Sequence, residues 1–182
     1  MRFSDKGGAV IAAILAATLP ATALAQSAAP ACLSNDEAEA LVTYALPATI
    51  RALSAQCAKS LPATAALVQS GVVTAARYQV DADRVWPQAS SAFDKASGLP
   101  VASVMGEKAL KPLIEKTISG EVTRNLRPKD CARTDRLINI LQPLPAKNMA
   151  MLVLLMFESG DPAMRARLPV TLCSAVPAPA TG

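Results

Sequence analysis

The stretch from Met149 to Gly160, near the C-terminal end of the chain, reads MAMLVLLMFESG. Nine uncharged residues, Met149 to Phe157, precede Glu158. As a helix they would extend about 13 Å, against about 30 Å for the hydrocarbon core of a bilayer, so they cannot span a membrane. A helix that is apolar on every face is normally buried on all sides. We therefore predict that a helix over 145–158 forms the centre of a helical core.

The same segment has a functional alternative, because methionine side chains adapt to irregular partners. In this interpretation Met149, Met151, Met156 and Phe157 line an apolar pocket or a docking surface. Such a pocket would carry an acyl chain or a similar apolar small molecule.

The end of the segment, Glu158-Ser159-Gly160-Asp161-Pro162-Ala163, resembles the Glu-Ser…Asn/Asp-Pro-x-Ala motif of lytic transglycosylases, helical enzymes that cleave peptidoglycan. The resemblance implies that Glu158 acts as general acid and base. It covers six residues, lacks the aromatic residue before Asp-Pro, and leaves 19 residues for the family's substrate groove. The structural alternative places Glu158 at the solvent edge of the helix, and murein cleavage is the third functional hypothesis.

The rest of the chain is also typical of helices. Only 3% of the residues are aromatic, alanine is abundant, and no segment alternates as a strand would. The apolar periodicity predicts seven helices, at 35–45, 47–58, 62–80, 81–98, 103–126, 128–141 and 145–158, followed by a short turn at 162–167. The expected fold is an all-α, single-domain bundle of antiparallel αα-hairpins.

Local signals set these boundaries. Ser34 and Glu37 form a capping box at the start of the first helix. Pro47 is expected to open the second helix, and Asp81 or Asp83 to cap the fourth. Pro112 is expected to kink or split the helix at 103–126.

The N-terminal region has the pattern of a secretory signal. Arg2 and Lys6 precede an apolar run over 9–19, and Ala23-Leu24-Ala25 suits a signal peptidase. We expect a cleaved signal peptide at 1–25, a short lead at 26–33, a helical domain at 34–173, and a disordered Ala/Pro tail at 174–182. The mature chain would be periplasmic or secreted, without a transmembrane segment. Lipidation of Cys32 is the alternative.

Four cysteines in an exported chain indicate two disulfides. If the helices pair as hairpins, Cys32 meets Cys57 and Cys131 meets Cys173. The alternative is a cross pairing such as Cys57–Cys131.

The densest basic cluster lies at 124–136. On a helix over 128–141, Lys129, Arg133 and Arg136 share one face, with Leu137 among the apolar residues opposite. This stripe is either a docking site for an acidic partner, such as a protein, a lipid phosphate or a cell-wall carboxylate, or a solvated face.

Most catalytic chemistries lack their residues. The chain has no histidine, no Cys-x-x-Cys pair and no glycine-rich phosphate loop, so we expect neither a metal nor another cofactor. A formal net charge of +4 is too weak to indicate nucleic-acid binding. The leading hypothesis is a non-catalytic binding or interaction module of the bacterial envelope, whose partner is an envelope protein or an apolar ligand. The alternative is the apolar carrier.

Overall fold

The computed structural model describes residues 32–159 and 171–173, whose regular secondary structure is helical apart from one isolated β-bridge. In chain order the elements are α1 (Asn35–Cys57), α2 (Ala66–Ser97), α3 (Val101–Met105), α4 (Glu107–Asn125), the 3-10 helix η1 (Pro128–Asp130), α5 (Cys131–Leu141) and α6 (Ala146–Ser159). The predicted all-α class is confirmed, with six α-helices in the described residues rather than the seven predicted. The predicted signal peptide, the lead up to residue 31, the turn at 162–167 and the tail at 174–182 lie outside the described residues.

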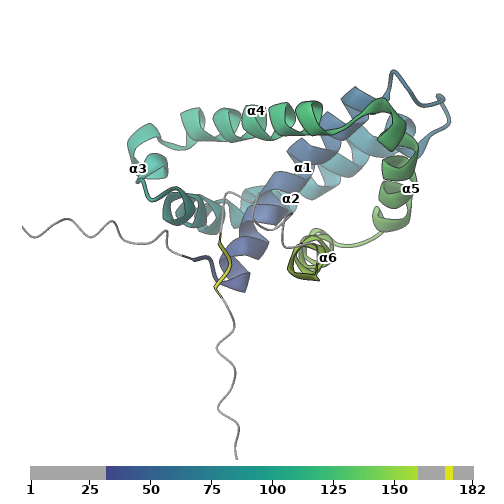
Figure 1. Ribbon diagram of the computed structural model, residues 1–182. Coiled ribbons are helices and arrows are strands. Elements are labelled where there is room, and N and C mark those ends of the chain that lie inside the picture. The colour runs from purple at the N-terminus through teal and green to yellow at the C-terminus, as the bar shows by residue number, and fades with distance from the viewer. Residues whose placement is uncertain (1–31, 160–170, 174–182) are drawn as a thin grey trace, which may run out of the picture.

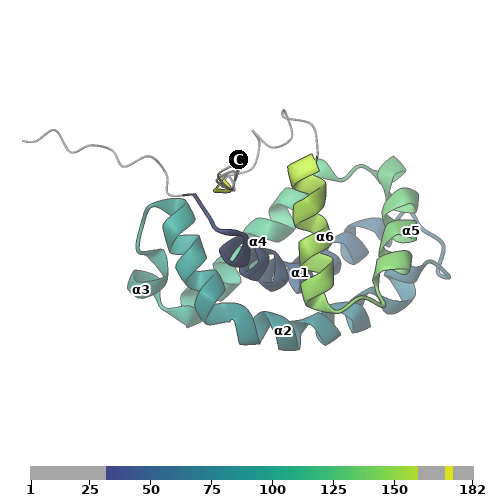
Figure 2. The same cartoon turned by 90° about the horizontal axis from the view of Figure 1, so that it is seen from below.

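Two long antiparallel helices, α1 and α2, run through the whole described body (Figure 1). α4 packs on α1 from one side and α6 packs on α1 from the other, as both views show (Figure 2). α5 contacts α2, and α3 connects α2 to α4. The α1–α2 pair is therefore the element on which the other helices assemble.

Small side chains allow α1 and α2 to approach closely. Ala40 on α1 and Ala82 and Ala89 on α2 are buried together around the Tyr44 and Trp86 rings. Nearer the α1–α2 turn, Gly71 faces Ser54 so closely that an added Cβ would lie 3.0 Å from Ser54 Cβ and would overlap its Oγ. At these positions a larger residue would push the two helices apart.

The predicted breaks at Pro47 and at Asp81 or Asp83 are wrong. α1 continues through Pro47, and α2 is a single helix of 32 residues that contains Pro87. A proline inside a helix removes one backbone donor and costs about 3 kcal/mol. Here Pro47 is fully buried between the buried residues Leu46 and Ala48, so packing on both sides of the proline offsets its local cost.

The break near the predicted helix at 103–126 falls at Gly106 rather than at Pro112. Gly106 has φ of 71°, a left-handed conformation that glycine adopts at little cost, and it separates α3 from α4. Pro112 lies in the second turn of α4, which continues through it. Gly98, with φ of 68°, ends α2 as expected.

The expectation that the apolar helix forms the centre of the fold is also wrong. α6 begins and ends within one residue of the predicted range, but it lies on the outside of α1 (Figure 2). Ala146, Met149 and Ala150 are buried against the long pair, whereas Met151 and Leu155 face outward with 46% and 57% of their surface exposed. The core lies instead between α1 and α2.

The predicted cysteine pairing is wrong, because the disulfides are Cys32–Cys173 and Cys57–Cys131. The error follows directly from the merged helices. A helix of 23 residues is about 34 Å long, so Cys32 and Cys57 lie at opposite ends of α1. A disulfide needs Cα atoms within about 7 Å of each other, which excludes Cys32–Cys57. The cross pairing left open from the sequence is the correct one.

The contact between Gly71 and Ser54 can be tested by substitution. We expect Gly71→Ala to lower the free energy of unfolding by about 1–3 kcal/mol, because the new methyl group overpacks the helix contact. The double variant Ser54→Ala/Gly71→Ala should recover part of this loss, since it removes the overlapping hydroxyl. Urea unfolding followed by circular dichroism measures both values.

Gly120 on α4 is the matched control. An added Cβ there meets nothing within 4 Å. Because alanine is the better helix former, Gly120→Ala should raise stability by about 0.5–1 kcal/mol. A Gly71→Ala variant as stable as Gly120→Ala would show that the two long helices are not in tight contact.

Candidate functional site

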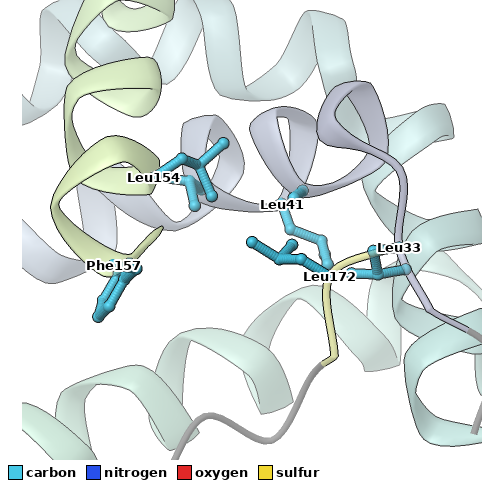
Figure 3. Close-up of a pocket in the computed structure, with 7 residues that line it drawn as sticks. Leu33, Leu41, Leu154, Phe157 and Leu172 are labelled. Atoms are coloured by element: carbon cyan, nitrogen blue, oxygen red, sulfur yellow. The ribbon is translucent and has the colours of Figure 1, made fainter. Parts of the chain in front are cut away.

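An apolar pocket lies where α6 crosses the start of α1 (Figure 3). Seven apolar residues line it, from the first turns of α1, from α6 and from the segments beside the disulfide: Leu33, Ala38, Leu41, Val42, Leu154, Phe157 and Leu172. Leu154 projects from α6 toward Leu41 and Leu172 (Figure 3). With a volume of about 70 Å³, the pocket can take one small apolar group.

Local interactions fix the walls of this pocket. The capping box is present as predicted: Ser34 Oγ accepts from the Glu37 backbone amide, and the Glu37 carboxylate accepts from the Ser34 amide at 2.7 Å. Lys95 on α2 donates to both Glu37 carboxylate oxygens, at 2.8 and 3.0 Å. These contacts anchor the first turn of α1 to the last turn of α2.

A short parallel bridge holds Leu33 beside Leu172. The Leu33 amide donates to the Thr171 carbonyl at 2.8 Å, and the Cys173 amide donates to the Leu33 carbonyl at 2.9 Å. The Cys32–Cys173 disulfide, with a Cα–Cα distance of 4.8 Å, closes the end of the bridge. We call residues 32–33 and 171–173 the disulfide clamp.

The predicted Met-lined pocket does not match this site. Of its four residues, only Phe157 lines the pocket. Met149 is buried against the long pair, in a cluster with Ile50 and Tyr78. Met151 and Met156 are 46% and 54% exposed. The sequence missed Leu33 and Leu172 because they meet only through the clamp.

The three cations of the predicted docking stripe are exposed together. Lys129 lies on η1 and Arg133 and Arg136 lie on α5, at the end of the molecule far from α3 (Figure 2). None of the three forms an ion pair with any residue that the structure describes. Their positive charge is therefore available to a partner.

The neighbouring acids point elsewhere. Asp130 pairs with Arg127 at 3.3 Å. Asp135 accepts from the backbone amide of Leu67 at 2.7 Å and so satisfies a free donor in the first turn of α2. Neither carboxylate forms an ion pair with Lys129, Arg133 or Arg136.

Two apolar side chains accompany the cations. Ile140, 71% exposed, shares the outward face of α5 with Arg133 and Arg136 at helical spacing. Leu137 was expected on the buried side but is 43% exposed. We call Lys129, Arg133, Arg136, Leu137 and Ile140 the basic face.

Two aromatic residues pack together in the core between α1 and α2. Tyr44 and Trp86 rings lie 4.8 Å apart, and Lys111 Nζ lies 5.0 Å from the Trp86 ring centroid. A hydrogen bond with Glu107 is the largest cause that raises the pKa of Lys111. Burial, aided by nearby carboxylates, raises the pKa of Tyr44 above its usual range, and its buried hydroxyl has no partner among the described residues.

Within the described residues, the structure does not place Glu158 in a pocket or cleft. Glu158 is exposed at the end of α6 and does not line the pocket, and residues 160–163 of the transglycosylase-like motif lie outside the described ranges. Within 32–159 and 171–173, no group of three or more acidic or cysteine side chains could hold a metal ion. No helix in these ranges is long and apolar enough to cross a membrane.

No protein-family model matches the chain, and comparisons with curated proteins and with solved structures found no significant similarity.

The contacts of Glu37 are expected to affect how the stability of the fold changes at low pH. Its hydrogen bonds, first with Lys95 and then with the Ser34 amide, lower the pKa of Glu37 below its usual value of 4.5. A carboxyl whose pKa is lower in the folded state stabilises the fold above the unfolded pKa, and this stabilisation is lost as the pH falls through the folded value. We expect Glu37→Gln to reduce the loss of stability below about pH 4.5, measured by urea unfolding across a pH series.

Glu158→Gln, which removes an exposed carboxylate from α6, is the control and should leave the acid profile as in the wild type. Identical profiles for wild type and Glu37→Gln would contradict the assigned role of the Lys95 contact.

Proposed function

We propose that this protein is a non-catalytic interaction module of the bacterial envelope that binds an acidic segment of another protein through its basic face. The observation that carries the proposal is the group of three exposed cations, unpaired among the described residues, beside the exposed Ile140 and Leu137. Charged and apolar groups on one helix face suit a partner with acidic and apolar residues of its own.

The shape of the basic face favours a protein segment over a membrane. Arg133 and Arg136 lie on one face of α5, whose 11 residues extend about 16 Å, and Lys129 lies on η1 directly before it. Recognition of anionic lipid surfaces typically uses clusters of about four to eight basic residues. A narrow stripe with an apolar end resembles the helix-in-groove and helix-on-helix contacts of peptide recognition.

The compartment is part of the same proposal. Two disulfides are compatible with a periplasmic or secreted protein, because disulfides persist in oxidising compartments. The signal-like pattern at 1–25 supports the same location.

The apolar carrier is the weaker alternative. Pockets for drug-sized ligands usually measure about 300–1,000 Å³. The pocket at the disulfide clamp measures about 70 Å³, which suits a single side chain better than an acyl chain.

Charge reversal on the basic face tests the proposal. The probe is a synthetic amphipathic helical peptide that carries Glu on one face and Leu on the opposite face. We expect wild-type protein to bind it more weakly as salt rises, and Arg133→Glu/Arg136→Glu to lower the affinity at low salt by at least about tenfold. Isothermal calorimetry or fluorescence anisotropy measures the affinities.

Lys108→Glu/Lys116→Glu on α4 is the matched control, because it reverses two exposed lysines and gives the same change in net charge. It should change the affinity by less than about threefold if the contact is local. An equal loss of affinity in both variants would show that net charge, and not the basic face, determines binding. Binding to phosphatidylglycerol vesicles, with none to the peptide, would overturn the choice of a protein partner.

A further inference from the structure

The two disulfides lie in different surroundings. Cys57 and Cys131 are 0% and 1% exposed and are packed with Leu67 inside an apolar cluster. Cys32 and Cys173 are only partly buried. We therefore expect a thiol reagent to react with Cys32–Cys173 in the folded protein sooner than with Cys57–Cys131, which is enclosed by the core.

The accessible disulfide also holds one wall of the apolar pocket. Each of its cysteines is adjacent in sequence to a pocket residue, Leu33 and Leu172 (Figure 3). Leu33 is fully buried, and Leu172 packs against the cluster that contains it. Besides the disulfide, the polar links across the clamp are the two backbone hydrogen bonds of the bridge.

We propose that Cys32–Cys173 is a site of thiol–disulfide exchange with a dithiol reductant, and that its reduction releases Leu172 from Leu33 and opens the apolar pocket. This site is separate from the basic face, so the proposal does not depend on the proposed function.

A dithiol supplies the two electrons that reduction of the Cys32–Cys173 disulfide requires. One thiolate of the reductant attacks Cys32 or Cys173, forms a mixed disulfide and releases the other cysteine as a thiolate. The second thiol of the reductant then attacks the mixed disulfide and releases the remaining cysteine. The reductant ends as its own disulfide, two electrons pass to the protein, and the two cysteines end as thiols.

The helical body is expected to survive this reaction. The capping box and the Lys95–Glu37 contact hold the start of α1 without help from the clamp. Cys57–Cys131 remains to link the end of α1 to the start of α5. Opening is therefore confined to Leu172 and the surface that it covers, which includes Leu33, Leu41 and Leu154.

Graded reduction of the full-length protein tests the site. The protein is incubated with dithiothreitol, free thiols are trapped with iodoacetamide, and each cysteine is quantified by peptide mass spectrometry. We expect Cys32 and Cys173 to be labelled at least about ten times faster than Cys57 and Cys131. Equal rates, or faster labelling of Cys57 and Cys131, would overturn the proposal.

Hydrogen exchange tests the opening. In the trapped, partly reduced protein, the amides of Leu33 and Cys173 should lose protection while those of α2 keep it. Binding of the dye 1-anilinonaphthalene-8-sulfonate should rise in parallel. Unchanged protection at Leu33 and Cys173 would overturn the opening step.

The variant Cys32→Ser/Cys173→Ser removes the disulfide without a reductant or iodoacetamide and so allows an independent test. It should retain the helical circular dichroism of the wild type and show the same local loss of protection. A variant that loses its helical signal would show that the clamp is a general staple of the fold, and this too would overturn the proposal.

Discussion

The contact between α1 and α2 is the constraint on which the rest of the structure depends. Alanines and Gly71 allow these two helices to lie close together along nearly their whole length. Each of the other helices then covers part of one continuous surface: α4 and α6 on two sides of α1, and α5 on α2. None of these shorter helices buries enough apolar surface to fold by itself, since α4 buries only Leu110 and α5 only Cys131.

Signals that act within a few residues were readable from the sequence. The capping box at Ser34 and the glycine end of α2 at Gly98 are where the pattern placed them, and the range of α6 is correct within one residue. Pro47 was misread because its local effect depends on what surrounds it. A buried proline in a well-packed helix is stabilised by contacts that only the tertiary structure defines. The wrong cysteine pairing follows from the same error, because it assumed a hairpin where one continuous helix exists.

Of the two candidate sites, the sequence predicts the basic face but not the apolar pocket. The spacing of Lys129, Arg133 and Arg136 predicts a shared face, and the structure has all three exposed on η1 and α5. The apolar pocket could not be predicted, since Leu33 and Leu172 are 139 positions apart and meet through the clamp. Composition was misleading for α6. Its apolar character indicated a central helix, but the alanine-rich pair already fills the centre, and α6 covers that pair from outside.

The position of the clamp has a mechanical consequence. Because Cys32 and Cys173 are bonded with their Cα atoms 4.8 Å apart, the helices between them form a closed covalent ring. A pulling force applied to the flanking chain on both sides passes directly through the sulfur–sulfur bond and bypasses the helical body. Tension that would unravel an open bundle one helix at a time leaves this one intact for as long as that single bond holds.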